Sequence, residues 1–259
     1  GANYPTTVVG SNGIMTFDPA NASCANAWPI TTTIPFAGGT ICSAGSTYYP
    51  RASIMGAYSD LDPRLSASPS NRKIQWETIG TAPCRKFVVS YYRVGVFGNN
   101  ACGQATPNTF QMVIHESTGI IEIFTEQKAC ASSTNAGRGI QGIQNWNRDA
   151  AVWVVGRNNA FWTDNNSGYR FVPSGPTSRF VIAEMLDMTG AVVATADTLT
   201  TTPGLLDIRF PNFCPPAGST QYVVRTQFSA CDNPANMLIS LDTITVNRTN
   251  SLNATASAT

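Results

Sequence analysis

The sequence has 259 residues, a formal net charge of +1 and a charged fraction of 12 %. Its basic residues are scattered singly, which gives no electrostatic basis for binding nucleic acid or an anionic membrane surface. No stretch reaches the roughly 18 consecutive apolar residues of a membrane-spanning helix. The first ten residues lack the basic and apolar regions of a signal peptide. We therefore expect no nucleic-acid partner and no membrane insertion, and an exported protein would carry its leader outside this sequence.

The first two thirds of the chain consist of short runs of β-branched and aromatic residues bounded by Gly, Pro, Asn and Asp. Such runs are typical of β-strands, and no window of a dozen residues combines a helical apolar period with capping residues. We predict strands at residues 13–18, 53–60, 73–80, 85–97, 110–116, 119–127, 138–145 and 150–156. Many short strands separated by turn residues indicate an all-β fold, with a β-sandwich or jelly-roll-like first domain.

The segment FQMVIHESTGIIEIF, residues 110–124, contains the single histidine, His115. A zinc protease would need a second histidine on a helix at the position of Gly119. This segment instead alternates with period two, which places Phe110 and Met112 on one face and His115 on the other. Together with the Ser-Thr-Gly turn, the pattern predicts a β-hairpin. We expect His115 to be a structural residue at the surface or rim near the end of the strand.

The sequence offers little for catalysis. The carboxylate pairs Asp60/Asp62 and Glu116/Glu122 could in principle serve a glycosidase, but no cleft is evident. There is no G-x-S-x-G elbow, P-loop or dinucleotide fingerprint, and the lone histidine has no supporting motif. We therefore expect that the protein is not an enzyme.

The segment VPSGPTS, residues 172–178, combines two prolines, a glycine and small residues, and predicts a domain boundary. We expect two strands joined by a DMTG turn within residues 179–200, which begin a second, strand-rich block. Further strands are predicted at residues 205–210, 221–230 and 237–247. We divide the chain into a β domain at 1–175, a smaller Ig-like β-sandwich at 176–248 and a low-complexity linker tail at 249–259.

The seven cysteines are widely spaced, with no CxxC pair. One histidine cannot complete a Cys/His zinc site, so we expect disulfides and an oxidising compartment. Spacing favours the pairs Cys214–Cys231, Cys102–Cys130 and Cys24–Cys42, which leaves Cys84 unpaired. The first five cysteines allow fifteen arrangements of two pairs, so other pairings stay open.

Seven motifs of the first domain form a recognisable succession: VVGSNGIMTFD, CANAWPI, ASIMGAYSDLDP, GTAPCRKFVVSYYRVGVF, NTFQMVIHESTGIIEIF, GRGIQGIQNWN and NNSGYRFVPSG. Over about residues 8–175 this succession resembles a domain of very large surface proteins of Bacteroidetes, including gliding-motility adhesins exported by the type IX secretion system. It is also similar to the nidogen-like extracellular domain. The second domain is similar to the Ig-like repeats that follow this domain in such adhesins.

The resemblance implies a non-catalytic, extracellular fragment of a large cell-surface adhesin. Its partners would be the type IX secretion and gliding machinery and neighbouring Ig-like repeats of the same chain. The tripeptides around Thr198 and Thr243, Asp-Thr-Leu and Asp-Thr-Ile, also resemble the O-glycosylation signal of these bacteria. The alternative is that both are ordinary threonines on a strand surface.

Asp60 and Asp62 in YSDLDPR form a candidate metal site. Carboxylates at positions i and i+2 point to the same side of a strand, which suits calcium, an ion that takes several oxygen ligands. The alternative is an Asp-Pro turn in which the carboxylates accept backbone hydrogen bonds. We expect no other cofactor.

Trp146 is a candidate glycan contact because it lies between Asn145 and Asn147. An aromatic ring beside amide groups is a common combination in glycan binding. The alternative function is therefore a carbohydrate-binding module that recognises surface polysaccharide. We expect most of the five tryptophans to fill the sandwich core or the seam between the domains.

Overall fold

The computed structural model describes residues 4–24, 28, 30–43, 47–64, 67–81, 84–97, 107–116, 118–131, 138–173, 179–200, 208, 210, 213–229, 238–248 and 254–258. Apart from one short 3₁₀ turn, η1 (Pro19–Asn21), every regular element in these ranges is a β-strand. The strands form three antiparallel sheets. The predicted all-β fold is therefore confirmed.

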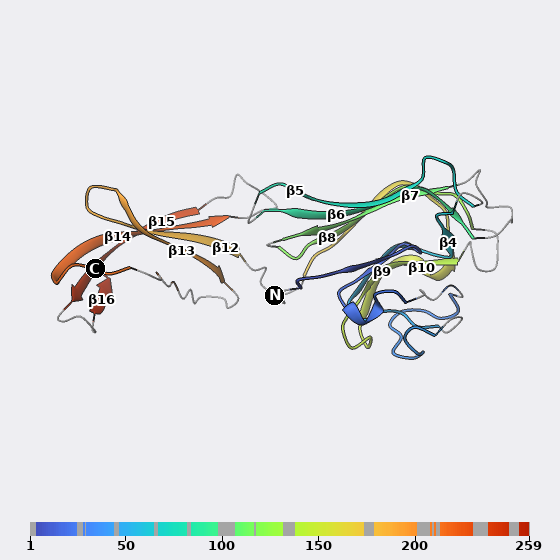
Figure 1. Cartoon of the computed structure of the whole chain (residues 1–259), viewed down its shortest axis with the longest axis horizontal. Helices are drawn as coiled ribbons and strands as arrows, with labels where there is room; N and C mark the ends of the chain where they lie inside the picture. The colour runs from blue at the N-terminus through green and yellow to red at the C-terminus, as the bar shows by residue number, and fades with distance from the viewer. Residues whose placement is uncertain are drawn as a thin grey trace.

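The first sheet has the strand order β1-β2-β3-β9-β10. Its strands are β1 (Val8–Gly10), β2 (Ile14–Thr16), β3 (Ser53–Tyr58), β9 (Arg138–Gln144) and β10 (Ala151–Phe161). The second sheet has the order β11-β8-β7-β6-β4, and β5 also pairs with β6. Its strands are β4 (Leu61–Asp62), β5 (Lys73–Ile79), β6 (Lys86–Val96), β7 (Asn108–His115), β8 (Ile121–Lys128) and β11 (Asp164–Phe171). The two sheets stack on each other (Figure 1).

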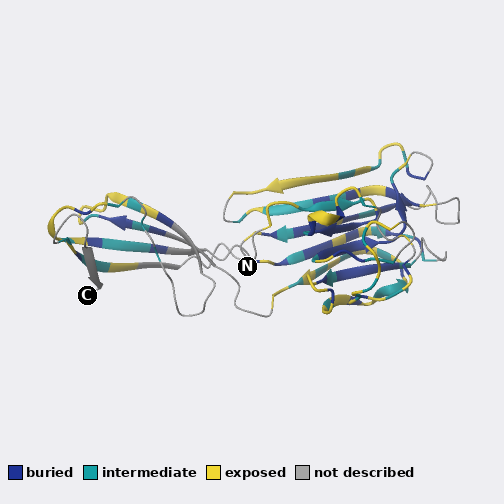
Figure 2. Cartoon of the chain, turned by 60° about the horizontal axis from the view of Figure 1, so that its bottom comes forward, coloured by how far each residue is buried: buried dark blue, intermediate teal, exposed yellow. Residues whose placement is uncertain are grey.

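The main core of the first domain lies between these two sheets, where Figure 2 shows many buried residues on the facing strands. The alternation of side chains along each strand supplies these core residues. The rings of Tyr91 and Phe110 stack at 4.6 Å, and the Tyr91 hydroxyl donates to the Gly10 carbonyl of the first sheet. A Cβ atom at Gly56 would lie 2.7 Å from the Phe110 ring, so this close contact requires a glycine.

The described parts of residues 17–52 contain η1 but no strand, and they cover the other face of the first sheet. We call them the cover loop. A second core cluster joins this loop to the sheet: Ile14, Ile30, Ile34, Tyr49, Met55, Tyr58 and Ile140. Side-chain amides of the sheet form hydrogen bonds with backbone N–H and carbonyl groups of the cover loop. Asn158 accepts from the Ile34 N–H at 2.8 Å and donates to its carbonyl at 2.7 Å. Gln144 accepts from Phe36 N–H and donates to the Pro50 carbonyl. The first domain therefore has three layers.

The third sheet has the order β13-β12-β14-β15-β16. Its strands are β12 (Arg179–Leu186), β13 (Val192–Thr200), β14 (Gly218–Ser229), β15 (Leu238–Arg248) and β16 (Ala254–Ala258). Met185, Tyr222 and Val246 form its buried cluster. No strand pairing among the described residues joins this sheet to the other two.

All eight strands predicted in the first domain are present, and residues 110–124 form the predicted hairpin of β7 and β8. The sequence did not predict β1, β4 and β11. The tail also differs from the prediction, because residues 254–258 form β16 and pair with β15 instead of forming a linker. Most of the strand predicted at 205–210 lies outside the described residues.

Candidate functional site

The turn between β9 and β10 holds Trp146, the candidate glycan contact, at its tip. Asn145 closes the turn: its Oδ1 accepts from the backbone of Asp149 and Ala150, and its Nδ2 donates to the Asp149 carboxylate at 2.6 Å. The amide of Asn145 therefore has a structural role in the turn. Trp146 and Asn147 are exposed, which leaves both side chains accessible to a ligand.

A predominantly apolar pocket of about 450 Å³ lies beside this turn. Ile54 and Ile143 of the first sheet and Ile121 of the second sheet contribute to its lining, together with Trp146 and Phe17. Ile54 belongs to the main core, and Phe17, Ile121 and Ile143 pack against it, so the pocket is the open end of the sandwich. It offers an apolar floor beside an exposed indole, an arrangement that suits the apolar face of a sugar ring.

Arg148, in the same turn, is buried and was not predicted as a site residue. Its guanidinium donates to the carbonyls of Gly38 at 2.9 Å and Ala37 at 2.6 Å, and lies over the Tyr48 ring at 4.5 Å. It therefore connects the turn of Trp146 to the cover loop. The sequence gives no signal for this contact, because the partners are backbone carbonyls about 110 residues away.

The expectation that most tryptophans fill the core is wrong. Trp162 is buried, whereas Trp28, Trp76, Trp146 and Trp153 have exposed fractions between 42 % and 67 %. The physical reason is position: Trp76 and Trp153 lie on edge strands β5 and β10, and Trp28 and Trp146 lie in loops. Tyr, Phe, Ile and Met fill most of the core instead.

Asp60 and Asp62 are both buried, at 7 % and 5 % exposure. The Asp62 carboxylate accepts from the Arg64 backbone N–H at 3.0 Å and from the Arg64 guanidinium at 2.9 Å, which is the predicted turn alternative. These hydrogen bonds lower the pKa of Asp62 despite its burial. Burial and the nearby charge of Asp62 raise the pKa of Asp60 to about 6. Calcium binding at this pair stays a prediction.

His115 is buried instead of lying at the surface, with an exposure of 6 %. Its Nε2 lies 2.7 Å from the Glu122 carboxylate, and Arg170 donates to the other carboxylate oxygen at 2.7 Å. Burial acts to raise the pKa of Glu122, but the bonds from His115 and Arg170 lower it overall. His115, Glu122 and Arg170 lie on the neighbouring strands β7, β8 and β11 and hydrogen-bond one another. The role of this cluster in the fold is therefore structural.

Lys128 is an unexpected buried charge, with an exposure of 1 %. Its Nζ donates to the carbonyls of Cys130 at 2.7 Å and Trp162 at 2.9 Å, and it lies 4.5 Å from the Trp162 ring centre. Burial, aided by the positive charge of Arg157, lowers the pKa of Lys128 to about 7. The burial of Lys128 was not predictable from the sequence, because a single lysine at a strand end is usually exposed.

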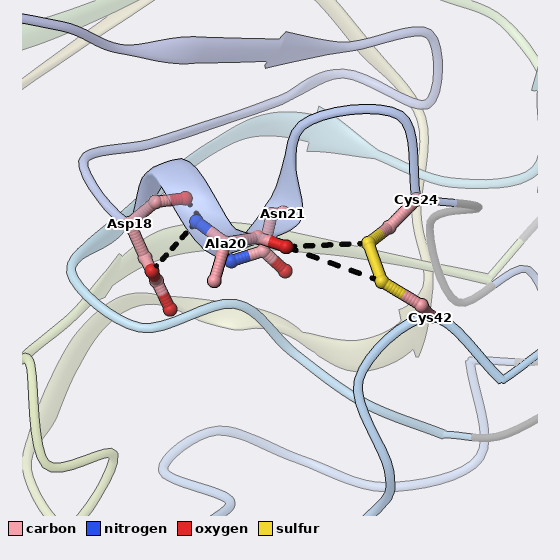
Figure 3. Close-up of a disulfide and its surroundings, with 5 residues drawn as sticks. All are labelled: Asp18, Ala20, Asn21, Cys24 and Cys42. Atoms are coloured by element: carbon pink, nitrogen blue, oxygen red, sulfur yellow. Dashed lines mark hydrogen bonds between the residues drawn. A yellow bond between two sulfur atoms is a disulfide. The ribbon is translucent and has the colours of Figure 1, made fainter.

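The predicted disulfide between Cys24 and Cys42 is present, with a Cα–Cα distance of 4.6 Å. It links two parts of the cover loop, and both sulfur atoms lie within 4.0 Å of the Ala20 carbonyl oxygen in η1 (Figure 3). The N-cap residue of η1, Asp18, accepts from Ala20 N–H at 3.0 Å. The disulfide therefore fixes the loop against the 3₁₀ turn.

Two other cysteine predictions are wrong. Cys214 has a free, exposed thiol, so it does not form the predicted bond to Cys231. Its sulfur instead lies 3.3 Å from the Arg248 guanidinium. Cys84, predicted to be unpaired, is disulfide-bonded, and so is Cys130. Cys102 and Cys231 lie outside the described residues. Spacing along the chain misled these predictions because a disulfide requires proximity in space.

The two candidate glycosylation sites lie in strands of the third sheet. Thr198 is in β13, opposite Val181, and Thr243 is in β15, opposite Val223. Thr243 is half-buried, and the alternation along β15 places it on the face opposite Val246 of the buried cluster. O-glycosylation of either threonine stays a prediction.

Within the described ranges, no three His, Cys, Asp or Glu residues gather as a metal-binding group. The same ranges contain no helix of the length and apolarity that crossing a membrane requires.

No curated protein and no solved structure shows significant similarity to the chain. Residues 1–173, which include the first and second sheets and the cover loop, match the family described as NIDO related. The chain belongs to this nidogen-related family of extracellular domains.

Proposed function

We propose that the chain is a non-catalytic adhesion module of a large bacterial cell-surface protein. The observation that carries the proposal is the match of residues 1–173 to the NIDO-related family, an extracellular domain type. Export by the type IX secretion system, a link to gliding motility and neighbouring Ig-like repeats are the finer parts of the proposal. They rest on the resemblance of the seven collinear motifs to gliding-motility adhesins.

The disulfide and the hydrogen bonds of the cover loop are compatible with an extracellular location. A disulfide restrains the cover loop, and disulfides persist in oxidising compartments. The side-chain amides of Asn158 and Gln144 accept hydrogen bonds from backbone N–H groups of the cover loop, so this layer is attached to the sheet although its described residues contain no strand.

The proposal is tested by labelling cells with an antibody against residues 1–173. We expect labelling of intact cells, and we expect it to disappear in a strain whose type IX secretion is disabled. Labelling that requires lysis of the cells would contradict the extracellular location. Surface labelling that persists in the secretion-deficient strain would contradict the export route alone.

A carbohydrate-binding module is the second candidate, and the apolar pocket beside Trp146 favours it. Affinity electrophoresis in polysaccharide gels can separate this function from adhesion to protein. Trp153→Ala is a matched control, because Trp153 has the same 42 % exposure as Trp146 but does not line the pocket. We expect Trp146→Ala to abolish retardation by the gel and Trp153→Ala to preserve it. Equal behaviour of the two variants would refute a polysaccharide site at this pocket.

A further inference from the structure

The edge strand β5 presents an unusually regular backbone edge. Its seven residues, Lys73 to Ile79, pair with β6 without a bulge, and its other edge has no partner among the described strands. Six of the seven residues are exposed, and Figure 1 shows β5 at the margin of the second sheet. Trp76 in its centre is 67 % exposed. Such an edge is a template for pairing with another strand.

The other outer strands of the first domain have features that hinder such pairing. The edge strand β1 has three residues. Strand β10 has two register shifts in its pairing with β9, and Gly156 within it has a φ of 77°. In β11, Asn166 has a φ of 56°. Bulges, short length and distorted backbone are common means of protecting an edge. Strand β5 has none of these three features.

The sequence of β5 is complementary to itself. In an antiparallel pair centred on Gln75, Lys73 of each copy lies opposite Glu77 of the other, and Ile74 lies opposite Trp76. The pair therefore contains two opposite-charge pairs on one face and two apolar pairs on the other. A register centred on Trp76 would place Lys73 opposite Ile79 and lose both charge pairs. Charge and apolarity therefore both favour the register centred on Gln75.

We propose that β5 is a homotypic docking edge, at which two copies of the chain pair antiparallel through residues 73–77 with a two-fold axis at Gln75. This proposal is independent of the adhesion ligand. The pairing would extend the second sheet from one copy into the next and cover the exposed Trp76 with Ile74 of the other copy. A single strand edge is a small interface, so we expect a weak dimer whose fraction rises with concentration.

The first experiment is a charge swap, read out by sedimentation velocity of the full chain over a range of concentrations. Lys73→Glu and Glu77→Lys each place like charges opposite each other twice in the dimer. We expect each to weaken dimerisation by roughly tenfold or more. The double variant Lys73→Glu/Glu77→Lys restores both opposite-charge pairs, so we expect dimerisation to recover. A double variant as weak as the single variants, or a monomeric chain at every concentration, would overturn the proposal.

The second experiment tests the register with engineered cysteines in a Cys214→Ser background, which removes the exposed free thiol of Cys214. The background variant without an engineered cysteine shows how much cross-linking the native cysteines cause. Opposed residues of an antiparallel pair have Cα atoms about 4.5–5.5 Å apart, within the range of a disulfide. Gln75→Cys should therefore form a cross-linked dimer on mild oxidation. Thr78→Cys is the control, because the two copies of residue 78 lie six residues out of register, about 20 Å apart. Equal cross-linking at both positions would refute this register. Circular dichroism and thermal melting of each variant exclude unfolding as the cause of a lost dimer.

Discussion

The substitution Asp60→Asn removes a carboxylate whose ionisation opposes folding. Burial and the neighbouring Asp62 raise the pKa of Asp60 from 3.8 to about 6. A carboxyl group with a raised pKa in the folded protein lowers the free energy of unfolding as pH rises from 3.8 through 6. The difference between these pKa values corresponds to about 3 kcal/mol at neutral pH. We therefore expect Asp60→Asn to gain about 3 kcal/mol relative to the native protein between about pH 4 and pH 8.

The assay is urea unfolding of both proteins at several pH values, with the difference between their free energies of unfolding as the readout. The pKa values of Asp62, Glu116 and Glu122 are lowered in the folded protein, so these groups lose stabilisation in acid in both proteins. Their contribution therefore largely cancels when the free energy of unfolding of one protein is subtracted from that of the other. A difference that does not change with pH would refute the reasoning, because Asp60 would then be as well solvated as in the unfolded chain.

The same pair of proteins tests calcium binding at Asp60 and Asp62. A bound cation would stabilise both carboxylates in their charged form. Millimolar calcium would then raise the melting temperature of the native protein at neutral pH, and it would do so less for Asp60→Asn. Identical melting in calcium and in EDTA would contradict the calcium prediction.

Replacing Cys24 and Cys42 by serine should lower the free energy of unfolding by about 2–4 kcal/mol, measured by urea unfolding, and an unchanged value would contradict a stabilising disulfide. The pKa of Lys128, lowered to about 7 by burial, predicts that stability rises from about pH 7 to pH 9 because the unfolded chain still binds the proton. Lys128→Met should abolish this rise in stability. If the rise persists in the variant, another titrating group causes it. His115→Ala should cost about 1–3 kcal/mol because Glu122 loses a buried hydrogen bond; thermal melting at neutral pH checks this, and an unchanged melting temperature would contradict a role in stability.

The strands were predictable because alternation and turn residues are local signals. The alternation in residues 110–116 places Phe110, Met112 and Ile114 on one face, of which Phe110 and Met112 are buried and Ile114 is half-buried. Val113 and His115 on the other face are buried too, so the alternation predicts the strand better than it predicts burial. The strand β11 was missed because its sequence, DNNSGYRF, contains Asn and Gly, residues that are depleted in strands. It forms because seven of its residues find partners in β8. This tertiary pairing overrides the weak local preference.

The candidate site was only partly predictable. An exposed Trp146 could be proposed from its Asn neighbours, but the pocket beside it depends on Ile54, Ile121 and Ile143, which are brought together by the two sheets. The cover loop could not be foreseen either, because its attachment through Asn158 joins residues 124 positions apart. Similarly, the environments of His115 and Lys128 follow from strand pairing and not from their neighbours in the sequence.

The central claim is that the chain is an extracellular adhesion module, and attachment of cells under flow tests it most directly. Cells whose surface protein lacks residues 1–259 would be compared with cells that carry the intact protein, at equal amounts of protein on the surface. The adhesion account predicts that the deletion lowers the fraction of attached cells. Unchanged attachment, with surface exposure of the remaining protein verified by antibody labelling, would contradict it.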